Sequence, residues 1–319
     1  IILIPLNYLL IKFFLTKFKI KRLLDLPDKS RKIHTKPVAK IGGIIIVLNL
    51  YFFYFLFDNS SLNIILVICL TLIFLIGFLD DLINLNPYLR LFLIILIIFI
   101  FLLIDKNLII KKIYFETFNM YINLNSIMTI FTIFSIVAII NAFNLFDGIN
   151  GLSISYFLII FTYIFFKFNL IELIPIISTC FVLIYFNLKN KIFLGDSGIY
   201  ILSTYLGFKL IEINNHHDGT IAVENIIILL MMPGIDMIRV FFERILDKKK
   251  FLSPDNRHLH HYLFSKYRLI KTLCFFIGIL LIPILIYEAK IFPSYIIILL
   301  NLIIYSWIII ILKKNAQNK

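Results

Sequence analysis

Long apolar runs, separated by short polar segments, dominate the pattern of this chain. A transmembrane helix needs about 20 apolar residues, with a range of about 17–25. The pattern predicts eleven helices, several of them short, at residues 1–16, 41–57, 62–79, 88–104, 127–143, 152–166, 170–188, 198–211, 226–243, 269–287 and 293–312. We read the first run as a membrane helix and not as a signal peptide, because no small-residue cleavage site follows it. We therefore predict an all-α, polytopic integral membrane protein with about 10–11 transmembrane helices, built as a single domain over residues 1–319.

The composition supports a membrane protein and excludes a soluble one. Of the 319 residues, 61% are hydrophobic and 15% are charged, against about 45–50% and 25% in typical soluble domains. The remaining polar side chains are too few to cover a core of this size. The three cysteines, Cys69, Cys180 and Cys274, lie inside apolar runs. We interpret them as lipid-facing or core residues, and not as disulfide partners or metal ligands.

The net charge is +13, and it is concentrated in a few segments. In a soluble protein such an excess would suggest nucleic acid. Here most of the 31 Lys and Arg side chains lie in residues 17–40, 80–90, 189–197, 244–268 and the C-terminal tail. This bias predicts that these segments face the cytoplasm from the inner (plasma) membrane, and that nucleic acid is not a partner. Basic loops at a membrane also attract phosphate-bearing substrates and anionic lipids.

Four acidic residues lie at span ends on this predicted cytoplasmic face. Asp80 and Asp81 end the third run, Asp147 ends the fifth, and Asp196 lies between the seventh and eighth. Adjacent carboxylates repel each other unless a cation lies between them. Magnesium typically takes one or two protein carboxylates and completes its shell with phosphates and water. A solvated helix end is the alternative interpretation of the Asp80–Asp81 pair.

A polar stripe precedes Asp147. Asn141, Asn144 and Asp147 are three residues apart and share one face of a helix end. Gly148 and Gly151 then break the helix and allow close backbone approach. Amides and a carboxylate suit a site for phosphate, metal and nucleotide. Hydrogen bonding between membrane helices is the alternative role for the Asn side chains.

Two further segments carry candidate chemistry. Asp196 is flanked by glycines in the sequence Gly-Asp-Ser-Gly, which alone is also ordinary turn composition. His258, His260 and His261 follow Arg257 and suit diphosphate binding or general acid–base work. A zinc cluster and a solvated loop with chance histidines are the alternatives, although the soft ligands of a structural zinc site are absent.

These segments, taken together and in order, resemble a known family. The matching stretches are the basic loop 27–34, Asp80–Asp81, 87–90, 141–151, 193–198, 233–236 and 258–261. Their order is similar to that of the polyprenyl-phosphate N-acetylhexosamine-1-phosphate transferases, the MraY/WecA-like membrane enzymes of glycosyltransferase family 4. The His-Leu-His-His sequence is more similar to the WecA/TagO branch.

The resemblance implies an activity. A polyprenyl phosphate in the membrane would attack the β-phosphate of a UDP-N-acetylhexosamine, UMP would leave, and a lipid-linked precursor of a cell-envelope polysaccharide would remain. It also implies a cytoplasmic-face active site and Mg²⁺, with Mn²⁺ as an alternative. A homodimer is compatible with it.

The resemblance also implies roles for individual residues. Asp196 would be the principal metal ligand, with Asp80, Asp81 and Asp147 at the metal and the phosphates. The residues implied in catalysis are Asp80, Asp81, Asp147, His258, His260 and His261. Those implied in nucleotide or substrate binding are Asn141, Asn144, Asn150, Phe193, Arg90 and Arg257.

Two positions depart from the family pattern. Asn150 stands where the family often has an acid, and an amide cannot act as a base or a strong metal ligand. Arg90 replaces a usual lysine, and keeps the charge without the compact geometry of an ammonium group. Both departures concern substrate choice.

A secondary transporter is the alternative function. Asp236 and Arg239 lie three residues apart within the predicted span 226–243 and could form a transporter-like pair. Transporter sites lie near the bilayer midplane at helices related by an internal repeat. The polar residues here gather at span ends, and the sequence shows no clear repeat. A structural ion pair also explains Asp236 and Arg239.

Overall fold

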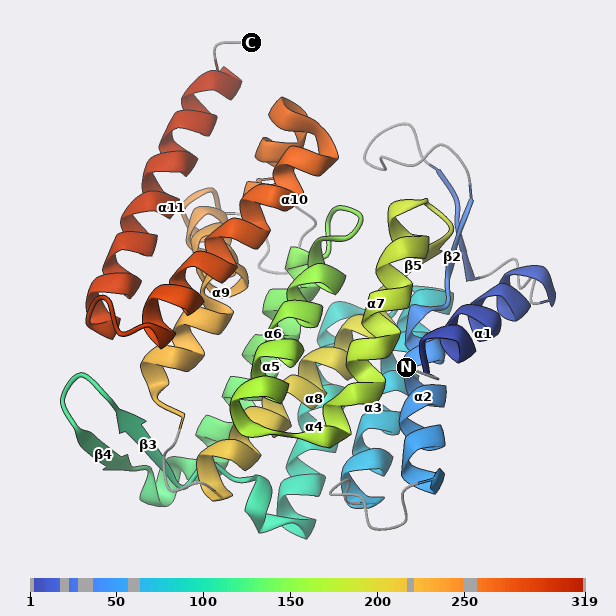
Figure 1. Ribbon diagram of the computed structural model, residues 1–319, viewed down its shortest axis with the longest axis horizontal. Coiled ribbons are helices and arrows are strands. Elements are labelled where there is room, and N and C mark those ends of the chain that lie inside the picture. The colour runs from blue at the N-terminus through green and yellow to red at the C-terminus, as the bar shows by residue number, and fades with distance from the viewer. Residues whose placement is uncertain are drawn as a thin grey trace. The chain divides into compact units, whose positions relative to one another are not determined.

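The computed structural model describes residues 3–17, 23–27, 37–56, 64–216, 221–248 and 257–317, and it is predominantly helical (Figure 1). Within these residues the helices are α1 (Leu3–Lys17), α2 (Gly42–Leu56), α3 (Ile64–Ile83), α4 (Pro87–Ile104), α5 (Met128–Phe146), α6 (Leu152–Phe168), α7 (Ile174–Leu188), α8 (Gly195–His216), α9 (Val223–Leu246), α10 (Leu259–Glu288) and α11 (Ser294–Gln317). Each predicted apolar run corresponds to one of them.

The apolar helices make this a multi-pass membrane protein. Seven helices in the described part of the chain are long and apolar enough to cross a membrane: α3, α4, α5, α7, α9, α10 and α11. Helices α1, α2 and α6 are apolar but shorter. Helix α8 is more polar, since it carries Asp196, Lys209 and Glu212. The predicted all-α polytopic fold is confirmed.

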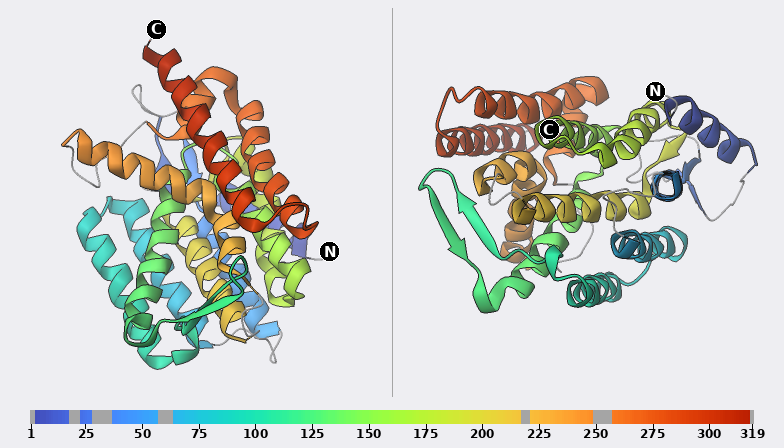
Figure 2. Two further views of the ribbon diagram at one scale, coloured as in Figure 1. Left: turned by 90° about the vertical axis from the view of Figure 1, so that its left-hand side faces the viewer. Right: turned by 60° about the horizontal axis from the view of Figure 1, so that its bottom comes forward.

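The chain forms two compact units. Unit 1 contains residues 1–106 and 153–208, and unit 2 contains residues 107–152 and 209–319. In unit 1, α7 packs against α1 and α2, and α3 packs against α2 and α4. In unit 2, α9 packs against α5, α10 and α11, and α10 lies beside α11, as two views show (Figures 1 and 2).

A small sheet in unit 1 precedes the start of α8. Strands β1 (Leu24–Asp25) and β2 (Val38–Lys40) pair antiparallel, and β2 pairs in parallel with β5 (Ile192–Phe193). The register places Lys40 opposite Phe193, two residues before α8 begins. The apolar-run analysis missed these strands, because two or three residues are too few to show an alternation.

A β-hairpin in unit 2 was also missed. Strands β3 (Lys112–Phe115) and β4 (Met120–Asn123) pair antiparallel, and the rings of Tyr114 and Tyr121 lie 4.7 Å apart across them. Figure 2 shows this hairpin clearly in its right-hand view. The carboxylate of Glu224 on α9 accepts hydrogen bonds from the backbone N–H groups of Glu116 and Thr117, both at 3.0 Å. A carboxylate distant in sequence therefore fixes the turn.

Helix α10 is broken near its tenth residue. Arg268 has φ 60° and ψ −173°, outside the helical region. A side chain at positive φ is strained, because its Cβ approaches the backbone. The Thr272 hydroxyl donates a hydrogen bond to the Arg268 carbonyl at 2.7 Å. The break separates the first turns, which carry His260 and His261, from the long apolar part of the helix.

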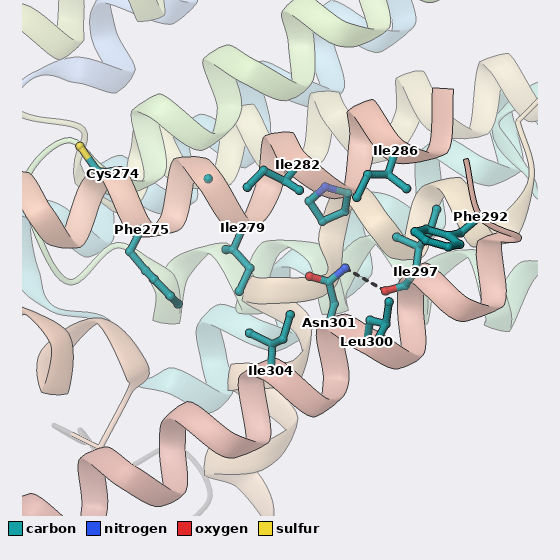
Figure 3. A pocket seen from close by; sticks show the side chains of 12 residues that line it. Cys274, Phe275, Ile279, Ile282, Ile286, Phe292, Ile297, Leu300, Asn301 and Ile304 are labelled. Atoms are coloured by element: carbon teal, nitrogen blue, oxygen red, sulfur yellow. Dashed lines mark hydrogen bonds between the residues drawn. The ribbon is translucent and has the colours of Figure 1, made fainter. Parts of the chain in front are cut away.

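An apolar groove of about 390 Å³ lies between α10 and α11. Its lining includes Phe275, Ile279 and Ile304, which are labelled in Figure 3. Asn301 also lines the groove, but its amide donates to the Ile297 carbonyl of its own helix at 2.9 Å. The lining is thus apolar apart from one amide that is already engaged.

Glycine allows α3 to approach the start of α8. A Cβ atom on Gly77 would lie 2.5 Å from the Ser197 Cα and 2.7 Å from its backbone nitrogen. Real Cβ atoms do not come this close to backbone atoms. Residue 77 must therefore be glycine for α3 to keep its contact with α8.

We expect Gly77→Ala to destabilise the protein by about 1–3 kcal/mol, since overpacking forces the backbone of two helices apart. The measurement is the melting temperature in detergent. Gly278→Ala is the matched control, because a Cβ on Gly278 would meet nothing within 4 Å. If the Gly77→Ala protein had the same melting temperature as the wild type, the two helices could move apart without loss of stability, and the expectation would be wrong.

Candidate functional site

The start of α8 is held by a carboxylate from α3. Asp81 accepts hydrogen bonds from the backbone N–H of Asp196 at 3.1 Å, and from the backbone N–H and hydroxyl of Ser197 at 3.1 and 2.9 Å. The first N–H groups of a helix lack intrahelical partners and carry partial positive charge. Gly195 has φ 74°, and a Cβ there would lie 2.6 Å from an Asp81 carboxylate oxygen. Asp81 therefore caps α8 from outside.

The neighbouring acid, Asp80, is also engaged. Its Oδ1 accepts the Leu85 backbone N–H at 2.7 Å, which closes the turn after α3. Its Oδ2 accepts from Arg90 Nη1 at 2.7 Å and from the Tyr200 hydroxyl at 3.3 Å. The Arg90 guanidinium also lies over the Tyr200 ring, 5.7 Å from its centre. The pair of adjacent acids is thus separated into two different environments.

Asp196 differs from both. Among the described residues, no hydrogen bond or ion pair engages its carboxylate, although the charges of Asp80, Asp81, Arg90 and Lys40 act on it. It lies in the first turn of α8, where the helix dipole favours a negative charge. Its carboxylate oxygens are therefore available to a ligand.

Lys40 at the end of β2 adds a second cation. Its Nζ lies 3.5 Å from an Asp81 oxygen and 3.9 Å from an Asp25 oxygen. Partial burial lowers the pKa of Lys40, but the charges of Asp81, Asp196 and Asp25 outweigh it and raise the pKa above its usual value of 10.5. Lys40 thus stays charged at neutral pH.

The acids of unit 1 fit a divalent cation if a substrate completes the shell. Asp196 has uncommitted oxygens beside two further acids, and hard oxygen ligands are those that magnesium prefers. Within the part of the chain that the structure describes, no three His, Cys, Asp or Glu side chains are arranged to hold a metal by themselves. Asp196 with phosphate oxygens and water would match the low protein ligand count of magnesium sites.

In unit 2 the end of α5 contacts the histidine segment. Asp147 is the C-cap of α5, and Gly148 follows it. A Cβ on Gly148 would lie 1.9 Å from Nε2 of His260, so this glycine makes room for the imidazole. His260 is fully buried, and neither ring nitrogen has a hydrogen-bond partner in the described residues. Its ring meets Phe146 edge-on at 6.2 Å.

The three histidine rings lie close together. The rings of His258 and His260 are nearly parallel with centres 5.5 Å apart, and those of His260 and His261 are 4.2 Å apart. We predicted these residues between two helices, but His260 and His261 lie in the first turn of α10, with His258 as its N-cap. Asp236 on α9 holds His258 through Nδ1 at 2.7 Å.

The remaining predicted residues have varied environments. The Asn141 amide donates to the Val137 carbonyl of its own helix at 2.9 Å. Asn144 is half-buried on the same helix, and Asn150 is half-buried in the turn that follows. Phe193 is half-buried on β5. Arg257 pairs with Asp247 and lies 3.8 Å from Glu243, so two carboxylates already balance its charge.

Comparison with known proteins supports the resemblance. Residues 63–214 match the model of glycosyl transferase family 4. Over these residues the chain is similar to members of this family. It is also 27% identical over 276 residues to a protein of Thermotoga maritima named undecaprenyl-phosphate alpha-N-acetylglucosaminyl 1-phosphate transferase, covering 83% of this chain and 82% of that protein.

The family 4 match covers one part of the candidate site. It includes Asp80, Asp81, Arg90, Asp147 and Asp196, whereas the histidine segment lies beyond the matched residues. Asp80, Asp81, Arg90 and Asp196 belong to unit 1, whereas Asp147 and the histidine segment belong to unit 2. The predicted convergence of Asp196 with Asp147 and the histidines stays a prediction.

Sequence reasoning missed three residues that contact the candidate functional side chains. Lys40 was counted only as part of a basic segment, although the β2–β5 pairing brings it toward α8. Tyr200 lies four residues after Asp196, and this helical spacing was the signal that could have identified it. Asp236 was interpreted only as the partner of Arg239, in a transporter-like or a structural ion pair, because its other partner, His258, is 22 residues away in sequence.

We expect the Arg90–Asp80 pair to show strong coupling in a double-mutant cycle. Removing one partner leaves the other charge unpaired in a partly buried place, which costs about 3–5 kcal/mol for a fully buried pair. Asp80→Asn and Arg90→Gln should each lower the unfolding free energy, and the double variant should lose less than the sum, with a coupling of about 0.5–3 kcal/mol. Additive losses would contradict the pairing.

Proposed function

We propose that this protein transfers an N-acetylhexosamine-1-phosphate from a UDP-sugar to a polyprenyl phosphate, with Mg²⁺ as cofactor and UMP as product. The observation that carries the proposal is the uncommitted carboxylate of Asp196 between two structurally engaged acids and two cations. The relation to glycosyl transferase family 4 and the name of the Thermotoga maritima relative support it. N-acetylglucosamine is the sugar to test first.

The charge balance of unit 1 suits two anionic reactants. Asp196 would hold the metal ion, with Asp80 and Asp81 beside it, and the family resemblance implies a role for Asp147 at the phosphates. When bound, the metal supplies charge neutralisation at the diphosphate. Arg90 and Lys40 neutralise the two structural acids, so these acids do not repel an incoming phosphate.

In this reaction the protein itself forms no covalent bond to the substrates. An oxygen of the polyprenyl phosphate forms a bond to the β-phosphorus, the bond from that phosphorus to the bridging oxygen breaks, and UMP leaves with the electron pair. The attacking phosphate is already mostly ionised at neutral pH, so it needs little help from a base. Positioning and electrostatics then carry the catalysis, as is typical of phosphoryl transfer. Asp147 would orient the phosphates in a direct attack.

Membrane location follows from the substrates. The lipid acceptor lies in the bilayer and the nucleotide sugar in the cytosol, so the reaction needs an interface. We propose that the basic segments place the site at the cytoplasmic face of the inner membrane. The products would initiate a lipid-linked cell-envelope polysaccharide.

The test is UMP release from UDP-N-acetylglucosamine by the detergent-purified protein, with polyprenyl phosphate and Mg²⁺. We expect release that requires both the lipid and the metal. A secondary transporter would release no UMP, so absence of UMP across a panel of UDP-sugars would overturn the proposal. A phosphorylated Asp147 or Asp81, trapped without the acceptor, would replace direct attack by a two-step route.

We expect Asp196→Asn to lower kcat by about 100-fold or more, because it removes a charge that acts on the reacting phosphates. Asp105→Asn is the matched control: Asp105 is the C-cap of α4, remote in sequence from the motifs. Both variants should insert into the membrane as the wild type does. Full activity in Asp196→Asn would remove Asp196 from the metal role.

A further inference from the structure

Asp236 on α9 has two oxygens in different surroundings. Its Oδ1 accepts three hydrogen bonds, from Arg239 Nη2 at 2.7 Å, the Tyr305 hydroxyl at 2.7 Å and the Leu259 backbone N–H at 3.1 Å. Its Oδ2 faces Nδ1 of His258 at 2.7 Å. The carboxylate is buried. Oδ1 is thus engaged by Arg239, Tyr305 and the backbone of α10, and Oδ2 binds the imidazole of His258.

We propose that Asp236 is a positioning residue that fixes the tautomer of His258, with the proton on Nδ1. An ionised carboxylate can only accept hydrogen bonds, so the nitrogen facing it must donate. In the neutral imidazole Nε2 then carries the lone pair. The inference rests on the proposed function in one respect: Nε2 of His258 is the atom presented to the diphosphate or sugar of the substrate.

The backbone around His258 is held from the same helix. Arg239 Nη2 also donates to the carbonyl of Arg257 at 2.6 Å, and Asp236 accepts from the N–H of Leu259. Helix α9 therefore binds the residues before and after His258 as well as its ring. A simple ion pair between Asp236 and Arg239 would need none of these contacts.

Helix α11 completes the arrangement through one hydroxyl. Tyr305 accepts a hydrogen bond from Arg239 Nε at 2.7 Å and donates its own proton to Asp236. The direction of that donation is fixed, since a guanidinium can only donate. Arg239 is anchored in turn by Glu243 at 2.7 Å. A residue well beyond the motif segments therefore fixes which Asp236 oxygen faces His258.

The asymmetry makes a specific prediction for Asp236→Asn. Three donors converge on the Oδ1 position, so an amide must place its oxygen there and its NH₂ toward His258. That NH₂ is a donor, and Nδ1 must then accept. The proton moves to Nε2, and the tautomer is inverted with almost no change in shape. The effect parallels the wrong-tautomer loss seen when the carboxylate behind a catalytic histidine is made an amide.

The decisive experiment is nitrogen NMR of the full-length protein labelled with ¹⁵N-histidine, above the pH at which histidines are charged. His258→Gln identifies the His258 signals by their loss. We expect Nδ1 to be the protonated nitrogen in the wild type and Nε2 in Asp236→Asn. A wild-type proton on Nε2, or no inversion in Asp236→Asn, would overturn the inference whatever the activity.

Kinetics test the positioning role separately. We expect Asp236→Asn to lower kcat of UMP release by about 1,000-fold or more, as an inverted tautomer does, with KM for the UDP-sugar within a few-fold. Tyr305→Phe removes one of three donors, and we expect about a 10-fold loss of kcat. Tyr295→Phe on the same helix is the matched control and should leave kcat unchanged.

The outcomes separate the two proposals. A wild-type protein without UMP release would contradict the proposed function, while the NMR signals would still decide the tautomer. An inverted tautomer with wild-type kcat would show that Asp236 does not act through His258. Should Asp236→Asn fail to fold, the wild-type NMR signals decide the inference, because a proton on Nε2 of His258 would reject it, and an unchanged kcat in Tyr305→Phe would reject the role of the α11 hydroxyl.

Discussion

The capping of α8 by the buried Asp81 carboxylate is the constraint on which the rest of unit 1 depends. Removing a carboxylate from water is costly, and only good hydrogen bonds and charge partners offset that cost. Asp81 finds them in two backbone N–H groups, a hydroxyl and Lys40. The contact requires glycine at positions 77 and 195, since side chains there would occupy the same space. With α8 fixed in this way, the Asp196 carboxylate has no hydrogen-bond or ion-pair partner among the residues that the structure describes.

In unit 2 a buried carboxylate also caps the start of a helix, here α10. The buried carboxylate of Asp236 accepts the Leu259 N–H in the first turn of α10, and it binds the N-cap His258. In each unit an aspartate from one helix holds the start of a second helix, and a candidate functional side chain stands at that start. Asp81 and Asp236, which accept several hydrogen bonds each, therefore have a structural role. The side chains beside them, Asp196 and His258, are the candidates for contact with the substrate.

The sequence alone predicted the helices well, because each apolar run is several helical turns long. It also grouped Asp80, Asp81, Asp147 and Asp196, since all lie at ends of runs, and the structure brings Asp80, Asp81 and Asp196 together at the start of α8. It did not separate their roles: only the three-dimensional contacts show that Arg90 engages Asp80 and that Ser197 engages Asp81. The role of Asp236 could not be predicted for a similar reason. Its carboxylate binds His258 and Tyr305, which lie 22 and 69 residues after it in the sequence. The short strands gave no periodic signal.

The break at Arg268 has a consequence for how deeply the histidines can sit. After the break, α10 continues for 20 residues to Glu288, which at 1.5 Å per residue is about 30 Å, the hydrocarbon thickness of a typical bilayer. A continuous helix of 30 residues would exceed that thickness and would have to tilt. The segment after the break matches that thickness by itself, so the direction of the first turns, which carry His260 and His261, is not fixed by bilayer matching.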